Sequence, residues 1–546
     1  MDIESKFFAP LRKERERLDS IPIEELFKED KQRFSQYSAS IEDMFLDFSK
    51  TKVDDAVLEL LLEMAEESGV EELRTAMFAG EKINTTENRS VLHTALRNKN
   101  GEPVLVDGVD IMDDIHDELQ KMIAFSDDIL SGEICAPNGK KFTDVVNIGI
   151  GGSGLGPLMG ERALRLYNQG LKIHCVSTVD ASNIVDRLAQ LNAETTLFVI
   201  SSKTFTTVET MTNATTAHKW MSEQFGAKAN EHFVAVTSNI EGAGKFGIPP
   251  SRVFSYGDYV GGRYSLCGPV GLPLMLCVGS DNFIDFLEGA YEMDCHFKEA
   301  PMEENLPIIM ALVDIWHINI CGFTSRAILP YDERMKYFPS YVEQLEMESN
   351  GKRVSKDGEA LSYQTSTVVW GATGINAQHS FFQMFHQGTQ VIPCDFLLSA
   401  QNDAPNLQHH HDLLVANCLA QSATMMKQQS LAEATEILAK TRTQEEAQKL
   451  ASHLVLENTH PTMTLLYKKL TPKTLGKIIA LYEHRVFVQG CIWQINSFDQ
   501  WGVEFGKKIA NQVLEKLQSD EMFEQKATST QGLLNVIKKW GNEEGC

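Results

Sequence analysis

The chain has 546 residues, more than a single hydrophobic core usually holds, so several packed units are expected. Its hydrophobic content of 43% is typical of a globular protein, and its formal net charge of −25 disfavours nucleic acid or an anionic membrane as a partner. The longest nearly apolar run, residues 268–279, is too short for a membrane span of roughly 20 residues.

The cysteines and histidines predict no metal site. Ten cysteines are scattered between Cys135 and Cys546 without a C-x-x-C pair, which indicates neither a zinc knuckle nor a disulfide framework. The histidines at 409–411 are consecutive, and on a helix they would point in three directions. The first residues mix acidic and basic side chains, unlike a secretory signal, so we expect a cytoplasmic protein in a reducing compartment.

The spacing of apolar residues changes along the chain. Up to about Asn98 it is helical, whereas from residue 143 onward apolar strands alternate with helical stretches, as in DVVNIGI, KIHCVST, TLFVISS and HFVAVTS. A second alternating series follows residue 305, with SRAILPYD, STVVWGA and QVIPCDFLLSA as strands. The pattern predicts an α/β fold: two tandem domains with parallel-rich sheets flanked by helices, an N-terminal helical region and a C-terminal helical arm. The predicted segments are residues 1–110, 111–285, 286–510 and 511–546.

The first strand of the alternating part runs into a glycine-rich loop, VVNIGIGGSGLGP. Gly149, Gly151 and Gly154 fit the G-x-G-x-x-G pattern of dinucleotide-binding proteins. The acidic residue expected about 20 positions later is missing, because the nearest candidate, Asp180, lies farther along. We therefore favour a loop whose backbone approaches a sugar closely, with Ser153 opening the next helix.

The segment TLFVISSKTFTT reads as a strand that ends in hydroxyl side chains and one lysine, followed by a helical pattern. Such a loop offers free backbone N–H groups, the positive end of a helix dipole, hydroxyl donors and an ammonium group. It predicts a phosphate site made by Ser202, Lys203, Thr204 and Thr207.

Arg263 lies between glycines and an aromatic residue in GGRYSLCGP, where the backbone can fold tightly and aim the guanidinium inward. Its permanent, delocalised charge suits an oxyanion, which it can stabilise without giving up a proton.

In SYVEQLEMESNGKR, Gln344 and Glu348 lie on one face of a predicted helix that ends at Asn350 and Gly351. Glu348 is thus in the last turn, where the helix dipole disfavours a further negative charge. This environment suits a general base that takes and returns a carbon-bound proton.

The segment NAQHSFFQMFHQGTQ predicts a helix capped by Asn376 and ended by Gly388, with His379 and His386 on one face. His386, in the last turn, is a candidate for proton transfer to or from a sugar ring oxygen.

The segment SFDQWGVEFGKKIANQ predicts another helix, on which Gln500, Glu504 and Lys507 form a polar stripe beside Phe498, Trp501 and Phe505. Alone, each of these motifs also has an ordinary explanation: a capped helix, a tight turn, a solvated glutamate, a partly buried histidine or a surface ion pair.

Together the segments resemble the glucose-6-phosphate isomerase family, from about Phe45 to Lys516. GGRYSLCGPVGLP and NSFDQWGVEFGKKIA are similar to its two signatures, and SSKTFTTVET, MESNGK and FHQGTQVIPCDF match its other site segments in order. The resemblance implies sugar-isomerase-type α/β domains, with the N-terminal region packed on the second. It also implies interconversion of glucose 6-phosphate and fructose 6-phosphate without a cofactor or metal.

The resemblance also assigns roles to the residues. The implied acid, base and stabilising groups are Glu348 as base, Arg263 beside the cis-enediol(ate), and His386 with Lys507 for ring opening. The implied sugar-phosphate contacts are Ser202, Lys203, Thr204, Thr207, Gly152, Ser153, Glu209, Gln344 and Gln500. The family forms homodimers in which the histidine segment crosses to the other site. Gly154 stands where many members have Asp, and Phe505 where Leu is expected.

Three other functions stay open. The glycine loop alone would suit a nicotinamide-dependent dehydrogenase. A non-catalytic sensor of sugar phosphates could use the same phosphate loop, but it would need no base, oxyanion arginine and ring-opening histidine together. Isomerases that act on mannose or amino-sugar phosphates are closer competitors.

Overall fold

The computed structural model describes residues 2–519 and 528–543. The chain divides into two compact units, residues 1–498 and residues 499–546. In the described part of the chain, no helix is both long and apolar enough to cross a membrane.

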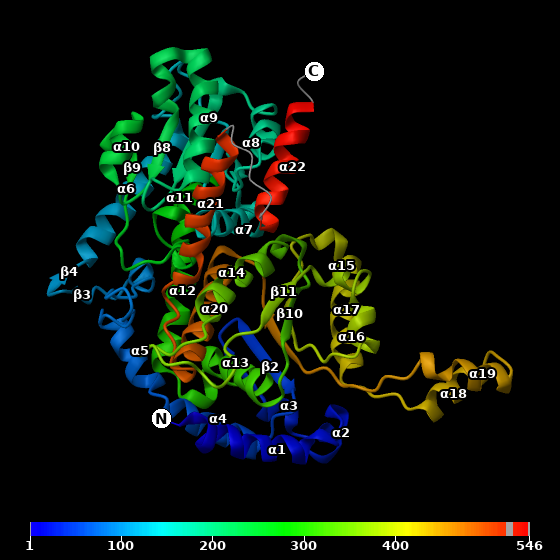
Figure 1. Ribbon diagram of the computed structural model, residues 1–546. Coiled ribbons are helices and arrows are strands. Elements are labelled where there is room, and N and C mark those ends of the chain that lie inside the picture. Colours follow the sequence, from blue (N-terminus) through cyan, green and yellow to red (C-terminus); the bar gives the residue numbers. More distant parts are fainter. Residues whose placement is uncertain (1, 520–527, 544–546) are drawn as a thin grey trace. The chain divides into compact units, whose positions relative to one another are not determined.

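The first sheet of the larger unit is entirely parallel, with the strand order β6-β5-β7-β8-β9. Its last two strands, β8 and β9, are labelled in Figure 1. Its inner strands are apolar on both faces because helices cover both sides, as expected for a parallel sheet. Its strands are β5 (Asp144–Ile148), β6 (Lys172–Val176), β7 (Thr196–Ser201), β8 (Phe233–Val236) and β9 (Val253–Phe254). The accompanying helices are α6 (Met112–Ser131), α7 (Gly152–Ala163), α8 (Ala181–Leu188), α9 (Val208–Phe225), α10 (Ile240–Phe246) and α11 (Leu272–Val278).

The second sheet has the order β1-β2-β13-β12-β10-β11. Its four later strands are parallel, whereas the hairpin β1–β2 joins β13 antiparallel. The strands are β1 (Ser38–Ile41), β2 (Met44–Lys50), β10 (Ser325–Pro330), β11 (Val368–Gly371), β12 (Cys394–Ser399) and β13 (Thr462–Tyr467). The helices that follow its parallel strands are α14 (Phe338–Asn350), α15 (Gly374–Gln378), α16 (Phe382–Gln387), α17 (Gln408–Met425), α18 (Leu431–Ala439) and α19 (Gln444–Leu450).

The parallel strands of the two sheets follow the same order. In each, the first strand is central, the second adds on one side, and the third and fourth add on the other. The order reverses beside β5 in the first sheet and beside β10 in the second. Ligands of open α/β sheets bind at the carboxyl ends of strands where the order reverses. The loops after β5, β7 and β10 therefore begin at the positions where this fold places ligands.

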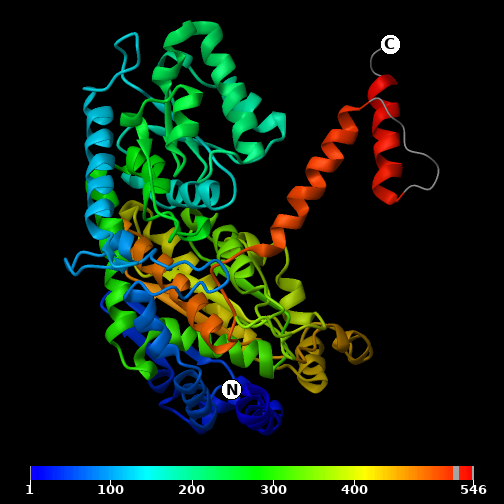
Figure 2. The ribbon, with the colours of Figure 1, turned by 60° about the vertical axis from the view of Figure 1, so that its left-hand side comes forward.

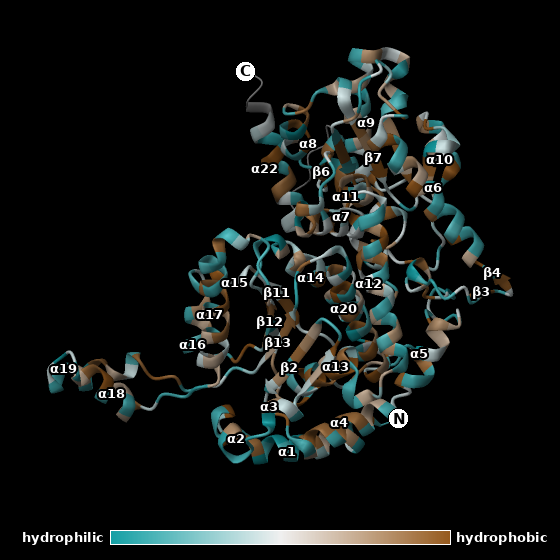
Figure 3. Cartoon of the chain, turned by 180° about the vertical axis from the view of Figure 1, so that it is seen from behind, coloured by the Kyte–Doolittle hydropathy of each residue, from teal (hydrophilic) through white to brown (hydrophobic). Residues whose placement is uncertain are grey.

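A long helix, α20 (Pro472–Ile492), is buried along nearly its whole length and packs against α12 (Ser280–Glu299) and α13 (Leu306–Ile315). The N-terminal helices lie on the side of the second sheet (Figure 2). In Figure 3 the strands are mostly apolar in colour, whereas the covering helices carry both colours. The N-terminal helices are α1 (Ala9–Asp19), α2 (Ile23–Glu29), α3 (Arg33–Gln36), α4 (Asp55–Glu67) and α5 (Val70–Phe78), and a small hairpin is formed by β3 (Leu105–Val106) and β4 (Val109–Asp110).

The described residues of the smaller unit form a short 3₁₀ turn (Trp501–Val503) and the helices α21 (Glu504–Gln518) and α22 (Ser529–Glu543). It exposes many large apolar side chains, among them Trp501 at 61% and Phe505 at 72%. Two helices cannot bury a core of their own, so this unit presents an apolar surface.

The predicted α/β architecture is confirmed, and each strand named in the sequence analysis is present. Helices predominate up to residue 98 as expected, but residues 38–50 form the unanticipated hairpin β1–β2. The strands β9 and β13 were also missed. The four predicted segment boundaries stay a prediction.

Candidate functional site

The glycine-rich loop after β5 lies against two other segments of the site. Gly151 has φ +57°, a left-handed backbone that favours glycine, and a Cβ there would lie 3.1 Å from the Gln344 side-chain nitrogen. A Cβ on Gly152 would fall 2.1 Å from the backbone oxygen of Gly262. These glycines therefore allow other segments of the protein to approach the loop closely, whereas their predicted approach to a sugar stays a prediction. Ser153 follows, partly exposed, in the first turn of α7.

The third glycine of the pattern has a different explanation. Gly154 is buried, and a Cβ there would lie 2.5 Å from the backbone oxygen of Gly149 and 3.2 Å from Ser177 Cβ. A larger residue at this position would require the loop to shift. Asp180, the acidic residue closest to the dinucleotide pattern, caps α8 by accepting a hydrogen bond from Ser182, so its carboxylate already serves as a helix cap.

The hydroxyl-rich loop joins β7 to α9 in a tight turn. Phe205 takes a positive φ of 55°, and its N–H bonds to the carbonyl of Ser202. Thr207 is the N-cap residue of α9, yet its side chain makes no capping hydrogen bond; its Oγ1 instead accepts from Ser202 Oγ at 3.2 Å. The Thr207 side chain therefore forms no hydrogen bond with the N–H groups of the first turn, and these groups can bind an anion. Thr204 is exposed and accepts from the Thr206 hydroxyl.

Lys203 extends toward the segment after β9. Its Nζ donates to the backbone oxygens of Asp258 and Val260 at 3.2 and 3.1 Å and lies 3.3 Å from the Asp258 carboxylate. Burial lowers the pKa of this ammonium group, against the opposing effect of Asp258. Glu209 is half-buried in the first turn of α9. The loop thus combines a partly dehydrated cation with a helix start, which suits a phosphate group.

Arg263 and Glu348 meet although they belong to segments that follow different sheets in sequence. Arg263 lies in a short 3₁₀ turn, Gly262–Tyr264, and its Nη1 is 3.3 Å from Glu348 Oε2. Gln344, one turn earlier on α14, donates from Nε2 to the same oxygen at 3.0 Å. The other oxygen of Glu348, Oε1, has no hydrogen-bond partner within residues 2–519 and 528–543, and the side chain is 26% exposed. One carboxylate oxygen is held and the other is left open, as a general base requires.

His386 lies in a different part of the larger unit. The helix predicted around His386 is in fact two short helices, α15 and α16, because the chain turns at residues 379–381. The expectation that Asn376 caps the helix is wrong, since Asn376 lies inside α15. His386 is in the last turn of α16, as expected, and its Nε2 bonds to Gln421 Oε1 at 3.1 Å. Within the described chain, no hydrogen bond joins it to Glu348 or to the phosphate loop.

The last predicted site residues belong to the smaller unit. Lys507 is on α21, and its Nζ makes an exposed ion pair with Glu504 Oε1 at 2.6 Å. Gln500 precedes the helices with φ −149°, so it is not on one helical stripe with Glu504 and Lys507 as predicted. Of the predicted residues, the larger unit brings together Gly152, Arg263, Gln344 and Glu348.

Three residues that the sequence analysis did not single out hold Arg263 in place. Its Nε donates to Ser349 Oγ at 2.6 Å, its Nη2 donates to the backbone oxygen of Ser497 at 2.7 Å, and its neighbour Tyr264 shares the Ser349 hydroxyl at 2.8 Å. Burial raises the pKa of Tyr264 to about 12, so this phenol keeps its proton. Ser349 lies within the MESNGK segment, and only its place in that motif could have indicated a role in the site.

No group of three or more His, Cys, Asp or Glu side chains among the described residues is arranged to hold a metal ion. His409 and His410 lie near the start of α17, and the neighbouring His411 bonds to the backbone oxygen of Ala400.

The model of the phosphoglucose isomerase family matches residues 47–534. The chain belongs to the phosphoglucose isomerase family. A glucose-6-phosphate isomerase from Chelativorans sp. is 50% identical over 529 residues, covering 96% of this chain and 97% of that protein. The glucose-6-phosphate isomerase of Rhizobium johnstonii is 49% identical over 519 residues, covering 95% and 96%. The crystal structure of a glucose-6-phosphate isomerase from Chlamydia trachomatis superposes with a TM-score of 0.83 at 29% identity, covering 98% of this chain and 99% of that one.

Proposed function

We propose that this phosphoglucose isomerase family member interconverts D-glucose 6-phosphate and D-fructose 6-phosphate, as a step of glycolysis and gluconeogenesis. The observation that carries the proposal is the contact of Arg263 Nη1 with Glu348 Oε2 at 3.3 Å, with Glu348 Oε1 left open. An aldose–ketose isomerase needs a base that reaches two adjacent carbons and a cation beside the oxyanion that forms. Family membership and the names of the relatives support the choice of sugars.

The substrate phosphate would bind at the start of α9. Ser202, Lys203, Thr204 and Thr207 would hold it through hydroxyl groups, the ammonium and the first-turn N–H groups. A fixed phosphate aligns the distant carbons of the sugar, so its binding energy contributes to the reaction step. The residues that would line the sugar are Gly152, Ser153, Glu209, Gln344 and Gln500.

Glu348 would move one proton between C2 and C1. It takes the C2 proton of the open-chain aldose, and the released electron pair forms the C1–C2 double bond while negative charge develops on O1. Arg263 stabilises this cis-enediol(ate) without donating a proton, because a guanidinium stays charged. Glu348 then returns the proton to C1, the O2 hydroxyl proton passes to O1, and O2 becomes the ketose carbonyl.

His386, assisted by Lys507, would open the sugar ring beforehand by moving a proton between the ring oxygen and the C1 hydroxyl. We further propose that His386 is supplied by the second chain of a homodimer, so that each site is shared. The separate hydrogen-bond environment of His386, whose partner Gln421 lies on α17, supports this arrangement.

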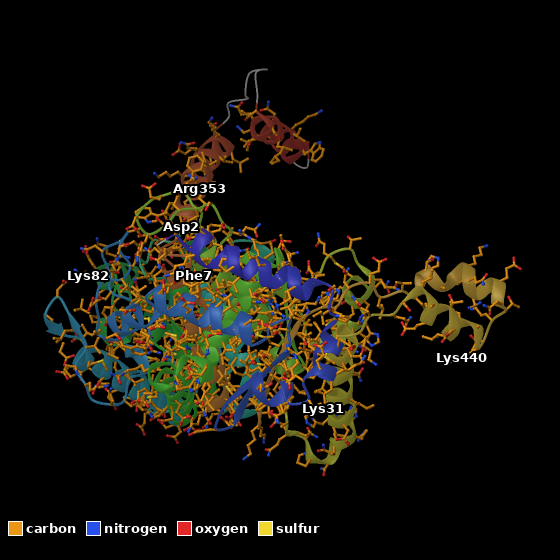
Figure 4. All side chains as sticks on the ribbon, turned by 90° about the horizontal axis from the view of Figure 1, so that it is seen from below. Asp2, Phe7, Lys31, Lys82, Arg353 and Lys440 are labelled. Atoms are coloured by element: carbon orange, nitrogen blue, oxygen red, sulfur yellow. The ribbon has the colours of Figure 1, made fainter. Side chains whose placement is uncertain are left out.

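Exposed apolar side chains support association of two chains. On α17 and α18, Leu413 is 62% exposed and Leu431 56% exposed, and α21 and α22 add further apolar positions. In Figure 4 the segment that carries Lys440, at the end of α18, stands away from the other side chains of the larger unit. Surfaces of this kind usually mark a protein interface.

We also propose that the enzyme works in the cytoplasm with no cofactor, no metal, and no nucleic acid or membrane as partner. The nine cysteines in the described residues are all free thiols, which fits a reducing compartment. The acidic composition disfavours polyanionic partners.

The proposed substrate is tested by a coupled assay on fructose 6-phosphate, glucose 6-phosphate, mannose 6-phosphate and glucosamine 6-phosphate. We expect rapid interconversion of the first two, with deuterium from heavy water entering at C1 or C2 as Glu348 exchanges its proton. Faster turnover of the mannose or amino-sugar phosphate would contradict the proposal. Binding of fructose 6-phosphate without turnover would instead favour a sensor.

The shared site is tested by mixing two inactive variants, Glu348→Gln and His386→Ala, through co-expression with different tags. If His386 acts across the dimer, a mixed dimer has one site with both changes and one intact site, so random pairing restores about a quarter of wild-type activity. Each variant alone stays nearly inactive. Recovery would be absent if both residues of a site came from one chain, because every site would then carry one change.

A further inference from the structure

The guanidinium of Arg263 is held from the base helix itself. Its side chain is 1% exposed. One of its nitrogens bonds to a residue in the last turn of α14, and another bonds to a residue that is itself hydrogen-bonded to that turn. Nε donates to Ser349 Oγ at 2.6 Å. Nη2 donates to the backbone oxygen of Ser497, whose own hydroxyl donates to Asn350 Oδ1 at 2.6 Å.

These contacts connect segments that follow the two sheets. Arg263 follows the first sheet in sequence, whereas Glu348, Ser349 and Asn350 end the helix that follows β10 of the second. The distance between base and cation thus depends on a junction between two parts of the fold. Because Ser349 is the residue next to Glu348, its bond to Arg263 fixes the guanidinium relative to the backbone that carries the base.

The anchor continues into the core. Asn350 Nδ2 donates to Gln489 Oε1 at 2.9 Å and to the backbone oxygen of Val486 at 3.0 Å, both on the buried helix α20. Ser349 and Asn350 are fully buried. A Cβ on Gly490 would lie 2.0 Å from Ser497 Oγ, so the small residue there leaves room for the Ser497 anchor.

We propose that Ser349 is a positioning residue of the isomerisation: its hydroxyl orients Arg263 so that Nη1 faces the oxyanion that forms beside Glu348. This inference rests on the proposed function. Ser349 transfers no proton to the sugar; it acts through Arg263. Without its Oγ, the buried Nε–H would lose this acceptor, and the guanidinium would rotate toward another one. Misplacement of a catalytic group by about 1 Å can cost on the order of 10²-fold in rate.

The test compares the steady-state kcat and KM of Ser349→Ala with those of the wild type. We expect kcat to fall by about 10–100-fold while KM changes less than about threefold, because the phosphate loop is untouched. The hydroxamic acid analogue of the open-chain sugar phosphate, which mimics the enediolate charge, should lose affinity in parallel. Glucitol 6-phosphate, which carries no charge at C1 and C2, should bind as tightly as before.

Two further variants separate positioning from general loss of structure. Ser265→Ala is the matched control, because Ser265 is equally buried near Arg263 but donates to the backbone oxygen of Gly262; we expect its kcat and analogue affinity to stay near wild type. Ser349→Thr keeps the hydroxyl and should recover much of the lost kcat. Should Ser349→Ala not fold, the nearly isosteric Ser349→Cys, with a weak acceptor, carries the same expectation.

Wild-type kcat and wild-type hydroxamate affinity in Ser349→Ala would overturn the inference. Equal loss of affinity for the hydroxamate and for glucitol 6-phosphate would also overturn it, since that pattern reports general disruption. Failure of the proposed function gives a different result, because the wild type itself would then not isomerise the sugar phosphates.

Discussion

Replacement of Glu348 by glutamine is expected to lower kcat by about 10²–10⁴-fold, the usual contribution of a positioned general base. The amide has nearly the shape of the carboxylate and can still face Arg263 and Gln344, whose nitrogens lie 3.3 and 3.0 Å from Oε2. It cannot accept a carbon-bound proton, however. The affinity for glucitol 6-phosphate should change little, because that ligand depends on the phosphate loop. Steady-state kinetics and calorimetric titration measure the two quantities separately.

A control on the same helix is Glu343→Gln, which removes a carboxylate outside the site contacts and should leave kcat unchanged. Lys203→Ala should give the opposite pattern to Glu348→Gln: KM rises strongly, since the ammonium group near the start of α9 is lost. If Glu348→Gln retained more than about a tenth of wild-type kcat, Glu348 would not be the base.

The parts of the fold that the sequence predicted are those in which local pattern and tertiary role agree. Apolar runs such as TLFVISS became buried parallel strands, because a strand covered on both faces has no polar side to show. The loop between β7 and α9 was predicted for the same reason: Ser202 directly follows the strand, and Thr207 directly precedes the helix. Their chemistry is local, so one segment suffices to indicate it.

The missed parts depend on contacts between distant segments. The hairpin β1–β2 is stable because it pairs with β13, more than 400 residues later, and no local pattern reports that partner. Helix α16 begins anew at Phe382 because Phe382 and Phe385 pack into the core cluster that also holds Ala377 of α15. Gln500 does not lie on one helix face with Glu504 and Lys507, because helix α21 begins only at Glu504.

The site shows the same division. Sequence motifs indicated Arg263 and Glu348 separately. Their contact forms where the turn after the first sheet packs against the helix after β10, and no local sequence pattern predicts that packing. Ser349 and Asn350 looked like ordinary helix-end residues. Their burial, and the bonds from Arg263 and Ser497, result from packing of α14 against α20 and against the turn that carries Arg263.

The largest expected effect on stability comes from a buried charge network behind α14. Arg485 on α20 donates from Nε and Nη2 to Asp314, each at 2.6 Å, and from Nη1 to Asp395 at 2.6 Å. Arg326 on β10 also contacts Asp314, and it reaches Glu346 in α14. All five side chains are at most 3% exposed. The network therefore joins β10, α13, α14 and α20, the elements that position Glu348.

We expect Arg485→Met to lower the free energy of unfolding by about 3–5 kcal/mol, because it leaves buried carboxylates without their bidentate partner. Methionine fills a similar volume, so the loss reports charge and hydrogen bonding more than a cavity. Urea unfolding at fixed protein concentration, followed by tryptophan fluorescence, measures the change. The control, Lys245→Met, removes an exposed pair with Glu241 and should scarcely shift the midpoint.

The pH dependence of this loss distinguishes charge from packing. Although burial alone would raise the pKa of Asp314, the attraction of Arg326 and Arg485 holds it at about 2, below its ordinary 3.8. A carboxyl with a depressed folded-state pKa contributes stability that is fully present above pH 3.8 and is lost as the pH falls towards 2. The difference between wild type and Arg485→Met should therefore be largest near neutral pH and shrink between pH 4 and 2, as Asp314 becomes protonated. A difference that stays constant over this range would mean that the variant disturbs packing and that the Arg485 charge contributes little.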